Sequence, residues 1–137
     1  MDETVLERIN GADAVIEWFG RWPSFHDAEV IEFRLLRDGL SRLAVHAWRT
    51  LPEVDADGYY KLDKHAVITF LISNIKDLEL AGEDFNRQNV LRGLTLENAD
   101  GRIKIQLWPS YGIGGYIVAG IVTVEMAPGE PSARRQK

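Results

Sequence analysis

The nine residues Trp22–Val30, WPSFHDAEV, mark the point at which the hydrophobic pattern of the chain changes. Before them, in residues 10–20, apolar side chains recur at the three- and four-residue spacing of a helix. After them, from residue 29 onward, apolar and polar side chains mostly alternate, which is the pattern of a β-strand. The stretch is therefore a joint between a helix and a sheet, and its residues decide how the two meet.

The segment before the joint predicts a short amphipathic helix over residues 11–19. Asn10 precedes it and has a side chain suited to capping the first exposed amides, and Asp13 adds a favourable negative charge in the first turn. Gly20 is suited to end the helix, because glycine readily adopts a positive φ angle there. The apolar face consists of Ala12, Val15, Ile16 and Phe19.

The rest of the chain predicts a sheet of about seven strands. Asp38-Gly39 and residues 99–102 are typical of hairpin turns. Residues 52–64 predict a polar loop, and residues 83–93 interrupt the alternation and predict a loop or one helical turn. Since no strand–helix–strand rhythm occurs, the predicted fold is α+β: a mainly antiparallel sheet, curved or folded into a half-open sandwich, with a short N-terminal helix. The predicted strands are residues 29–36, 42–51, 65–73, 77–82, 94–98, 102–108 and 116–126.

Composition excludes several classes of function. The 137 residues carry a formal net charge of −5 and contain no cysteine. Disulfides, thiolate catalysis and cysteine-bound metals are therefore excluded, and the acidic balance disfavours nucleic-acid binding. No apolar run approaches the roughly 18 residues of a membrane helix, and the acidic N-terminus is unlike a signal peptide. We expect a cytoplasmic protein with a single domain at 3–127 and a disordered tail at 128–137.

The polar residues of the joint have two interpretations. In the structural one, Trp22 and Phe25 bury large apolar areas that anchor the helix to the sheet, while neighbouring polar groups satisfy the turn or contact a partner. In the other, the cluster ligates a metal ion together with His46 or His65 and serves a metal-dependent hydrolase. Adjacent side chains point to opposite faces of an extended chain, which favours the structural interpretation. The polar residues concerned are His26, Asp27 and Glu29.

Three further motifs favour local structural roles. Asp55–Gly58 lacks the oxygen ligands and closing glutamate of a calcium loop, and predicts a solvated turn. The glycine-rich stretch 110–116 precedes a strand rather than a helix, so it predicts a tight turn or bulge rather than a phosphate loop. Asn86 and Asn89 lie where alternation fails, and their amides are suited to satisfying local backbone groups or contacting a partner. No nucleophile or paired catalytic set emerges, so we predict no catalytic residue, cofactor or metal.

Several of these landmarks, in this order, resemble the immunity protein 50 family of bacterial polymorphic-toxin systems. The resemblance rests on FGRWPSFHDAEV at 19–30, HAVITFLISNIKDLEL at 65–80, FNRQNVLRGL at 85–94 and SYGIGG at 110–115. It implies a small cytoplasmic protein that binds and blocks a cognate toxin, and it implies no catalytic residues.

The resulting hypothesis is a non-enzymatic binding protein that covers a toxin's active site with an acidic, aromatic surface. Tyrosine and tryptophan dominate the energetics of interfaces, which makes exposed aromatic residues the predicted contacts. The sequence leaves the toxin unidentified and a homodimer open. The predicted contacts are Trp48, Tyr59, Tyr60, Trp108 and Tyr111.

Overall fold

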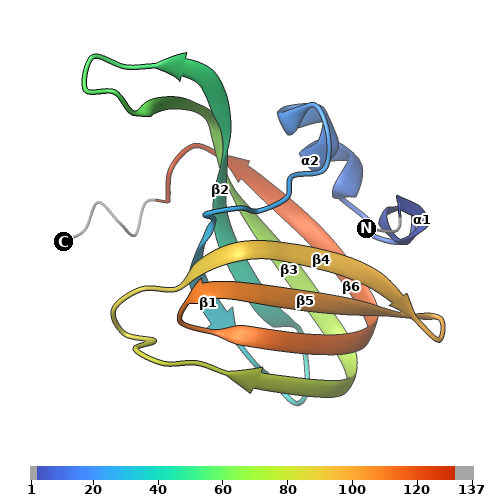
Figure 1. The fold of residues 1–137 in the computed structure, drawn as a ribbon. Helices are drawn as coiled ribbons and strands as arrows, with labels where there is room; N and C mark the ends of the chain where they lie inside the picture. Colours follow the sequence, from blue (N-terminus) through green and yellow to red (C-terminus); the bar gives the residue numbers. More distant parts are fainter. Residues whose placement is uncertain (1–2, 132–137) are drawn as a thin grey trace.

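A computed structural model describes residues 3–131, which form two short helices and six strands (Figure 1). The helices are α1 (Glu3–Leu6) and α2 (Ala12–Phe19). The strands are β1 (Glu29–Arg34), β2 (Ser41–Val54), β3 (Tyr60–Ala81), β4 (Val90–Ala99), β5 (Arg102–Tyr111) and β6 (Gly114–Pro128). None of the described helices is long and apolar enough to cross a membrane.

The strands form a closed antiparallel barrel in the order β1-β2-β3-β6-β5-β4. The two ends of the sheet meet where β1 approaches β4. There the amide of Val30 donates to the carbonyl of Asn89, and the amide of Leu91 donates to the carbonyl of Ala28, both at 2.8 Å. Closure of this kind pairs the outer strands of the sheet and leaves fewer open edges.

The predicted antiparallel sheet with a short N-terminal helix is confirmed. Residues 3–131 contain six strands rather than about seven, because the predicted strands at 65–73 and 77–82 are both parts of the 22-residue β3. Asn74 adopts a φ angle of 56° within β3, and the register with β6 shifts just after it. This irregularity breaks the alternation in the sequence while the strand continues. The sheet closes into a barrel instead of remaining curved or half-open.

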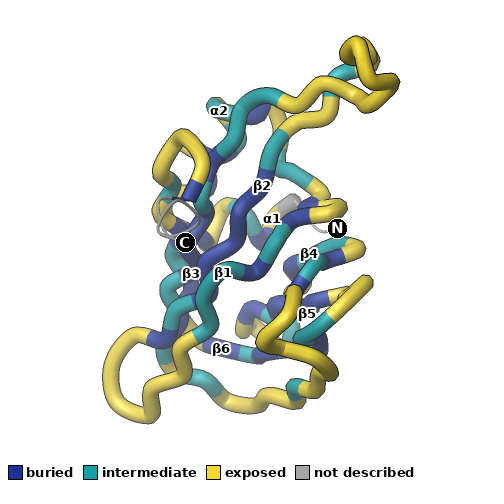
Figure 2. Tube along the Cα trace, turned by 90° about the vertical axis from the view of Figure 1, so that its left-hand side faces the viewer, coloured by how far each residue is buried: buried dark blue, intermediate teal, exposed yellow. Residues whose placement is uncertain are grey.

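The core lies inside the barrel and beneath the helices (Figure 2). Alternate residues of each strand point inward, as the period of two requires. Val5 of α1 and Val15 and Phe19 of α2 belong to the same core cluster. The largest fully buried side chains include Leu43, Ile68, Phe70, Ile72, Leu91, Leu94, Leu96, Ile105, Leu107 and Ile117.

The start of α2 differs from the prediction. Gly11, not Asn10, is the N-cap residue, and no side chain caps the helix. Asn10 instead forms a parallel bridge with Thr123, and its carbonyl accepts the amide of Val124 at 2.8 Å. The predicted end is confirmed, since Gly20 has a φ angle of 88° and its amide donates to Ile16 at 2.7 Å. The main-chain contacts of Asn10 with β6 therefore replace the side-chain cap that the sequence predicts.

Beyond the barrel, β2 and β3 continue as a two-stranded hairpin, residues 50–62, which we call the arm (Figure 1). The prediction of a polar loop over residues 52–64 is wrong, because β2 runs to Val54 and β3 begins at Tyr60. A two-stranded ribbon is exposed on both faces, so its sequence lacks the apolar–polar alternation by which a barrel strand is recognised. Near the C-terminus, β6 reaches Pro128, and residues 132–137 of the predicted tail lie outside the described residues.

Candidate partner-binding surface

The joint Trp22–Val30 is anchored by aromatic packing. Phe25 is 2% exposed, and its ring lies 5.7 Å from that of Trp22 and 6.1 Å from that of Phe70, centroid to centroid. Trp22 also meets Phe70 edge to face at 6.3 Å. Such geometries are favourable for aromatic quadrupoles. The three rings attach the segment after α2 to the middle of β3.

The backbone of the joint adopts an unusual conformation that helps to close the barrel. Phe25 and Asp27 have φ angles of 64° and 65°, which are uncommon for residues other than glycine. In this conformation the amide of Asp27 donates to the carbonyl of Leu91 at 2.8 Å, and the amide of Ala28 donates to Phe25 at 3.1 Å. The joint thus continues directly into the contact between β1 and β4.

The polar side chains of the joint do not gather around a common point. His26 and Asp27 have side chains 67% and 61% exposed, with 3.6 Å between His26 Nε2 and Asp27 Oδ2. His26 Nδ1 lies 3.2 Å from the carbonyl of Arg92. Glu29 begins β1 and stands opposite His46 of β2. Within residues 3–131 no group of three or more histidine, aspartate or glutamate side chains is placed to hold a metal ion.

The structure does bring together two histidines that the sequence left apart. His46 Nε2 lies 3.1 Å from His65 Nδ1, and the rings stack at 5.3 Å. The ring of Trp48 meets that of His46 edge to face at 5.0 Å. His46 is paired with Val67, and His65 precedes Val67 by two positions, so the two histidines are diagonal neighbours on one face of the sheet. No sequence signal gives the pairing of β2 with β3 residue by residue, so the contact could not have been predicted.

Asn89 connects two loops through hydrogen bonds of its side chain. It is 8% exposed, its amide nitrogen donates to the carbonyl of Phe85 at 2.7 Å, and its amide oxygen accepts the amide of Ile113 at 2.9 Å. These bonds tie the β3–β4 loop to the β5–β6 turn. Asn86 is exposed in the same loop. The glycine-rich stretch forms the turn between β5 and β6.

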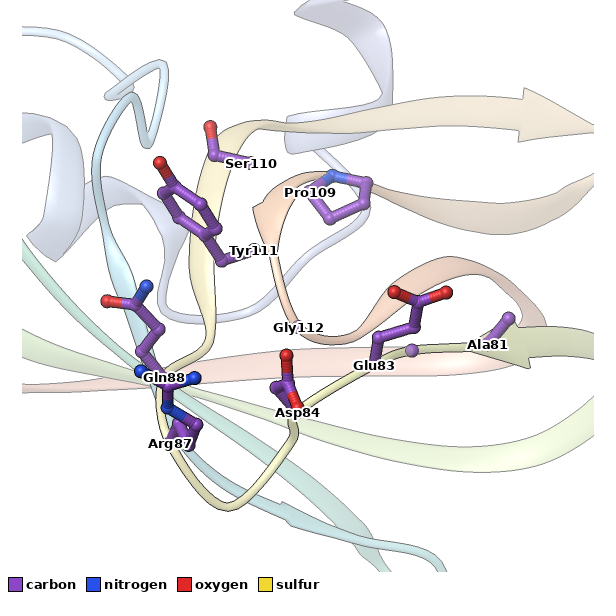
Figure 3. Close-up of a pocket in the computed structure, with 10 residues that line it drawn as sticks. Ala81, Glu83, Asp84, Arg87, Gln88, Pro109, Ser110, Tyr111 and Gly112 are labelled. Carbon is purple, nitrogen blue, oxygen red and sulfur yellow. The ribbon is translucent and has the colours of Figure 1, made fainter.

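The two loops border a hollow of about 720 Å³ (Figure 3). Ser110 and Tyr111 line it from the turn, and the residues that line it from the loop are Glu83, Asp84, Arg87 and Gln88. Tyr111 is 59% exposed, and the nearby Trp108 is 42% exposed with its indole nitrogen 3.2 Å from the Thr95 hydroxyl. The hollow carries both acidic and basic side chains, so its charge does not select one class of ligand.

The arm carries the most exposed aromatic side chains of the described chain. Tyr59 is 73% exposed and Tyr60 62% exposed, and Val54 and Leu62 are 55% and 45% exposed. Val54 is paired with Tyr60 across the hairpin, and Leu62 follows Tyr60 by two positions. Opposite and alternate residues share a face of a β-ribbon, so Val54, Tyr60 and Leu62 form one apolar face. We call these three residues the arm face.

An ion pair supports the base of the arm. Arg49 Nε and Arg49 Nη2 donate to the two carboxylate oxygens of Asp63 at 2.9 Å and 2.6 Å. These hydrogen bonds hold the pKa of the Asp63 carboxyl below its usual value and raise that of Arg49. At the tip, Asp55 Oδ1 accepts the amides of Asp57 and Tyr59 at 2.9 Å and 3.0 Å. Asp55 therefore serves the turn, as expected for a solvated turn rather than a calcium loop.

Comparison with known families identifies the chain. The sequence model of immunity protein 50 matches residues 11–128, most of the chain. The chain belongs to the immunity protein 50 family. No curated protein and no solved structure matches it.

The predicted partner contacts of this immunity protein 50 family member lie on two surfaces. Tyr59 and Tyr60 lie on the arm, and the half-buried Trp48 lies at its base. Trp108 and Tyr111 lie near the end of β5, beside the hollow that also borders the last residue of β3. The length of β3 separates the two surfaces (Figure 1). Sequence reasoning missed Val54 and Leu62, whose exposure follows from the projection of the arm.

Proposed function

We propose that this protein is a non-enzymatic binding protein that neutralises a bacterial toxin by covering the toxin's active site, with the arm as its principal contact. Membership of the immunity protein 50 family supports the class of function. The arm supports the mode of contact. Tyr59 and Tyr60 belong to this surface in our proposal, and Trp108 and Tyr111 belong to a second, peripheral one.

The observation that carries the proposal is the exposed arm face. Val54, Tyr60 and Leu62 are each between 45% and 62% exposed, although they lie side by side on one ribbon. Contiguous exposed apolar side chains of this kind mark interaction sites. Tyrosine suits such a site, because it buries a large area while losing little conformational entropy. Figure 2 shows the arm extending well away from the barrel, where a partner can surround it.

Charge supports a basic partner surface. The chain has a net charge of −5, and the arm contains Glu53, Asp55 and Asp57 against Lys61. Complementary charge speeds the encounter of two proteins and suppresses incorrect partners more than it adds affinity. A toxin whose active site binds an anionic substrate would present the matching positive surface.

The test is co-expression with the toxin encoded in the neighbouring reading frame. The wild-type chain should relieve growth arrest, and the variant Tyr60→Ala/Leu62→Ala should not. The purified double variant should bind the toxin at least about 30-fold more weakly, the effect expected from losing an interface hot spot. Ile121→Ala is the matched control, because Ile121 is 50% exposed on β6 away from the arm.

Two results would contradict the proposal. One is a double variant that neutralises the toxin as well as the wild-type chain. The other is growth arrest that the wild-type chain relieves for none of the neighbouring toxin-like proteins. Loss of binding in Tyr111→Ala, with the arm variant unaffected, would move the contact to the surface beside the hollow.

A further inference from the structure

We propose that the open edge of β3 in the arm receives an extended strand of the toxin, which adds to the sheet beside Tyr60–Asp63. This inference rests on the proposed function, because it assumes that the arm contacts the toxin. It goes further by naming the mode of recognition: main-chain hydrogen bonds in addition to side-chain packing.

The same edge of β3 is occupied along nearly all of its remaining length. From Ala66 to Ala81 it pairs with β6. At His65 the carbonyl accepts the amide of Gly129 at 2.7 Å, and at Lys64 the carbonyl accepts the indole N–H of Trp18 at 2.9 Å. Between residues 60 and 63 no described strand lies on this side. A strand added there would continue the line that β6 begins.

The main chain of the arm presents its hydrogen-bonding groups to this edge. The amide of Asp55 donates to the carbonyl of Tyr59 at 2.8 Å, so Tyr59 directs its carbonyl toward β2. Main-chain groups of successive residues in an antiparallel strand point alternately toward and away from the neighbour. The N–H and C=O groups of Tyr60 and Leu62 therefore point away from β2. The carbonyl of Lys64, two residues further on, points the same way and binds Trp18.

The opposite edge of the arm is blocked. On β2 the register with β3 is irregular between Thr50 and Val54, and Pro52 has no amide hydrogen to donate. Proline and irregular register are the usual means of preventing strand pairing at an edge. The edge of β3 has no proline, and its outward residues Tyr60 and Leu62 also belong to the arm face. A strand bound there would place alternate side chains against that face.

The edge suits a strand of another protein better than a second copy of this chain. Lys61 and Lys64 lie within or beside the open segment. Two copies joined through this edge would bring both pairs of lysines into one short ribbon, where like charges repel. A toxin strand without basic residues at those positions carries no such cost. The occupant we propose is therefore a strand of the toxin.

Amide hydrogen exchange tests the inference directly. The full chain is measured by NMR, free and bound to the purified catalytic domain of the neighbouring toxin. We expect the amides of Tyr60 and Leu62 to exchange at least about 100-fold more slowly in the complex, because strand addition gives them hydrogen-bond acceptors. The amide of Asp55, already bonded within the arm, reports whether the hairpin itself is intact.

Replacement of the Leu62 amide by an ester removes one donor and keeps the side chain. We expect this change to weaken toxin binding about 3- to 10-fold, the effect of one hydrogen bond. The Leu62→Ala variant is the matched control, because it keeps the amide and loses the side chain. In both variants, unchanged exchange at Asp55 confirms that the arm is folded.

The outcomes separate the two proposals. If Tyr60→Ala/Leu62→Ala abolishes binding while the Tyr60 and Leu62 amides exchange in the complex as in the free chain, strand addition is wrong and the proposed function stands. If that double variant binds normally, the arm is not the toxin contact, and both the proposed mode of contact and strand addition are wrong. If the free chain dimerises by light scattering and protects the same amides without toxin, a second copy occupies the edge and the inference is overturned.

Discussion

At the scale of single residues, Phe25 shows how the joint is held. Its ring is 2% exposed between Trp22 and Phe70, although its φ angle of 64° is unfavourable for a bulky residue. A left-handed conformation costs about 1–2 kcal/mol, and burying an aromatic ring contributes more than this. The burial of the ring therefore maintains the backbone conformation that directs Asp27 toward Leu91.

Truncating this ring should be costly. We expect Phe25→Ala to lower the free energy of unfolding by about 3–5 kcal/mol, because it leaves a cavity without relieving the backbone strain. Urea denaturation followed by circular dichroism measures the change. His26→Ala is the control, since the His26 side chain is 67% exposed. A Phe25→Ala variant as stable as His26→Ala would contradict the assignment of the joint as a structural anchor.

Tyr116 has a pKa above its usual value, chiefly because of the negative charge of Asp77, whose carboxylate it also binds at 3.2 Å. A raised pKa means that the folded state holds the phenolic proton more tightly than the unfolded state. The resulting stability is present below about pH 10 and is lost as the pH rises through the folded value. We expect Asp77→Asn to lower this pKa in a titration of phenolate absorbance, with Tyr116→Phe identifying the signal. No change in Asp77→Asn would refute the stated cause.

At the scale of secondary structure elements, Gly11 sets how α2 meets β6. It has a φ angle of 94°, and a Cβ atom there would overlap the carbonyl oxygen of Val124. The preceding residue, Asn10, binds Val124 through its own carbonyl. Any side chain at position 11 would therefore push the helix away from the barrel.

The effect of that overlap can be isolated. Gly58 has a similar φ angle of 87° at the tip of the arm, but a Cβ atom there would meet nothing within 4 Å. We expect Gly58→Ala to cost about 1 kcal/mol from backbone strain alone, and Gly11→Ala to cost at least about 2 kcal/mol more. Thermal unfolding of both variants provides the comparison. An equal loss of stability in the two variants would mean that α2 moves away from Val124 at no cost in free energy.

The base of the arm has its own pH dependence. Hydrogen bonds from Arg49 hold the pKa of Asp63 below its usual value, so the pair stabilises the folded state above the unfolded pKa of about 3.9. That stability is lost as the pH falls through the lower, folded value. We therefore expect the difference in unfolding free energy between wild type and Asp63→Asn to be constant from pH 7 to about 4 and to shrink below it. A difference that persists unchanged at the lowest pH would exclude the ion pair as its source.

At the scale of the whole molecule, the barrel and the arm have different roles. The core ends at Ala47 on β2 and begins at Ala66 on β3, so no arm residue belongs to it. The barrel thus provides stability, while the arm provides accessible surface. Residues on a projecting hairpin can change with a partner without altering the core.

This division predicts that the arm is dispensable for folding. Replacing residues 50–62 by Asn-Gly joins Arg49 to Asp63, which are already paired and whose main-chain groups face each other, through a favoured two-residue turn. We expect the melting temperature to stay within about 4 °C of wild type, equivalent to about 1 kcal/mol. Toxin binding should be lost in the same variant. A fall of more than about 10 °C would show that the arm contributes to the stability of the barrel.

The sequence by itself determined the elements whose pattern is strictly local. The 3.6-residue period and Gly20 located α2, and the alternation after residue 29 identified an antiparallel sheet. The aromatic residues of Trp22–Val30 identified the joint. These features depend on neighbours within a few positions, and side-chain period and backbone freedom are properties of those neighbours.

Only the tertiary structure decided the closure of the barrel, the projection of the arm and the pairing of His46 with His65. Each depends on which strand residues pair between segments distant in sequence, and that pairing leaves no compositional trace. Residues 52–64 are typical of a loop, yet residues 52–54 and 60–64 form strands because β2 and β3 extend past the barrel as a hairpin. The exposure of Tyr60 and Leu62 likewise depends on which segments lie beside them in space. The spacing of apolar residues along the sequence does not predict it.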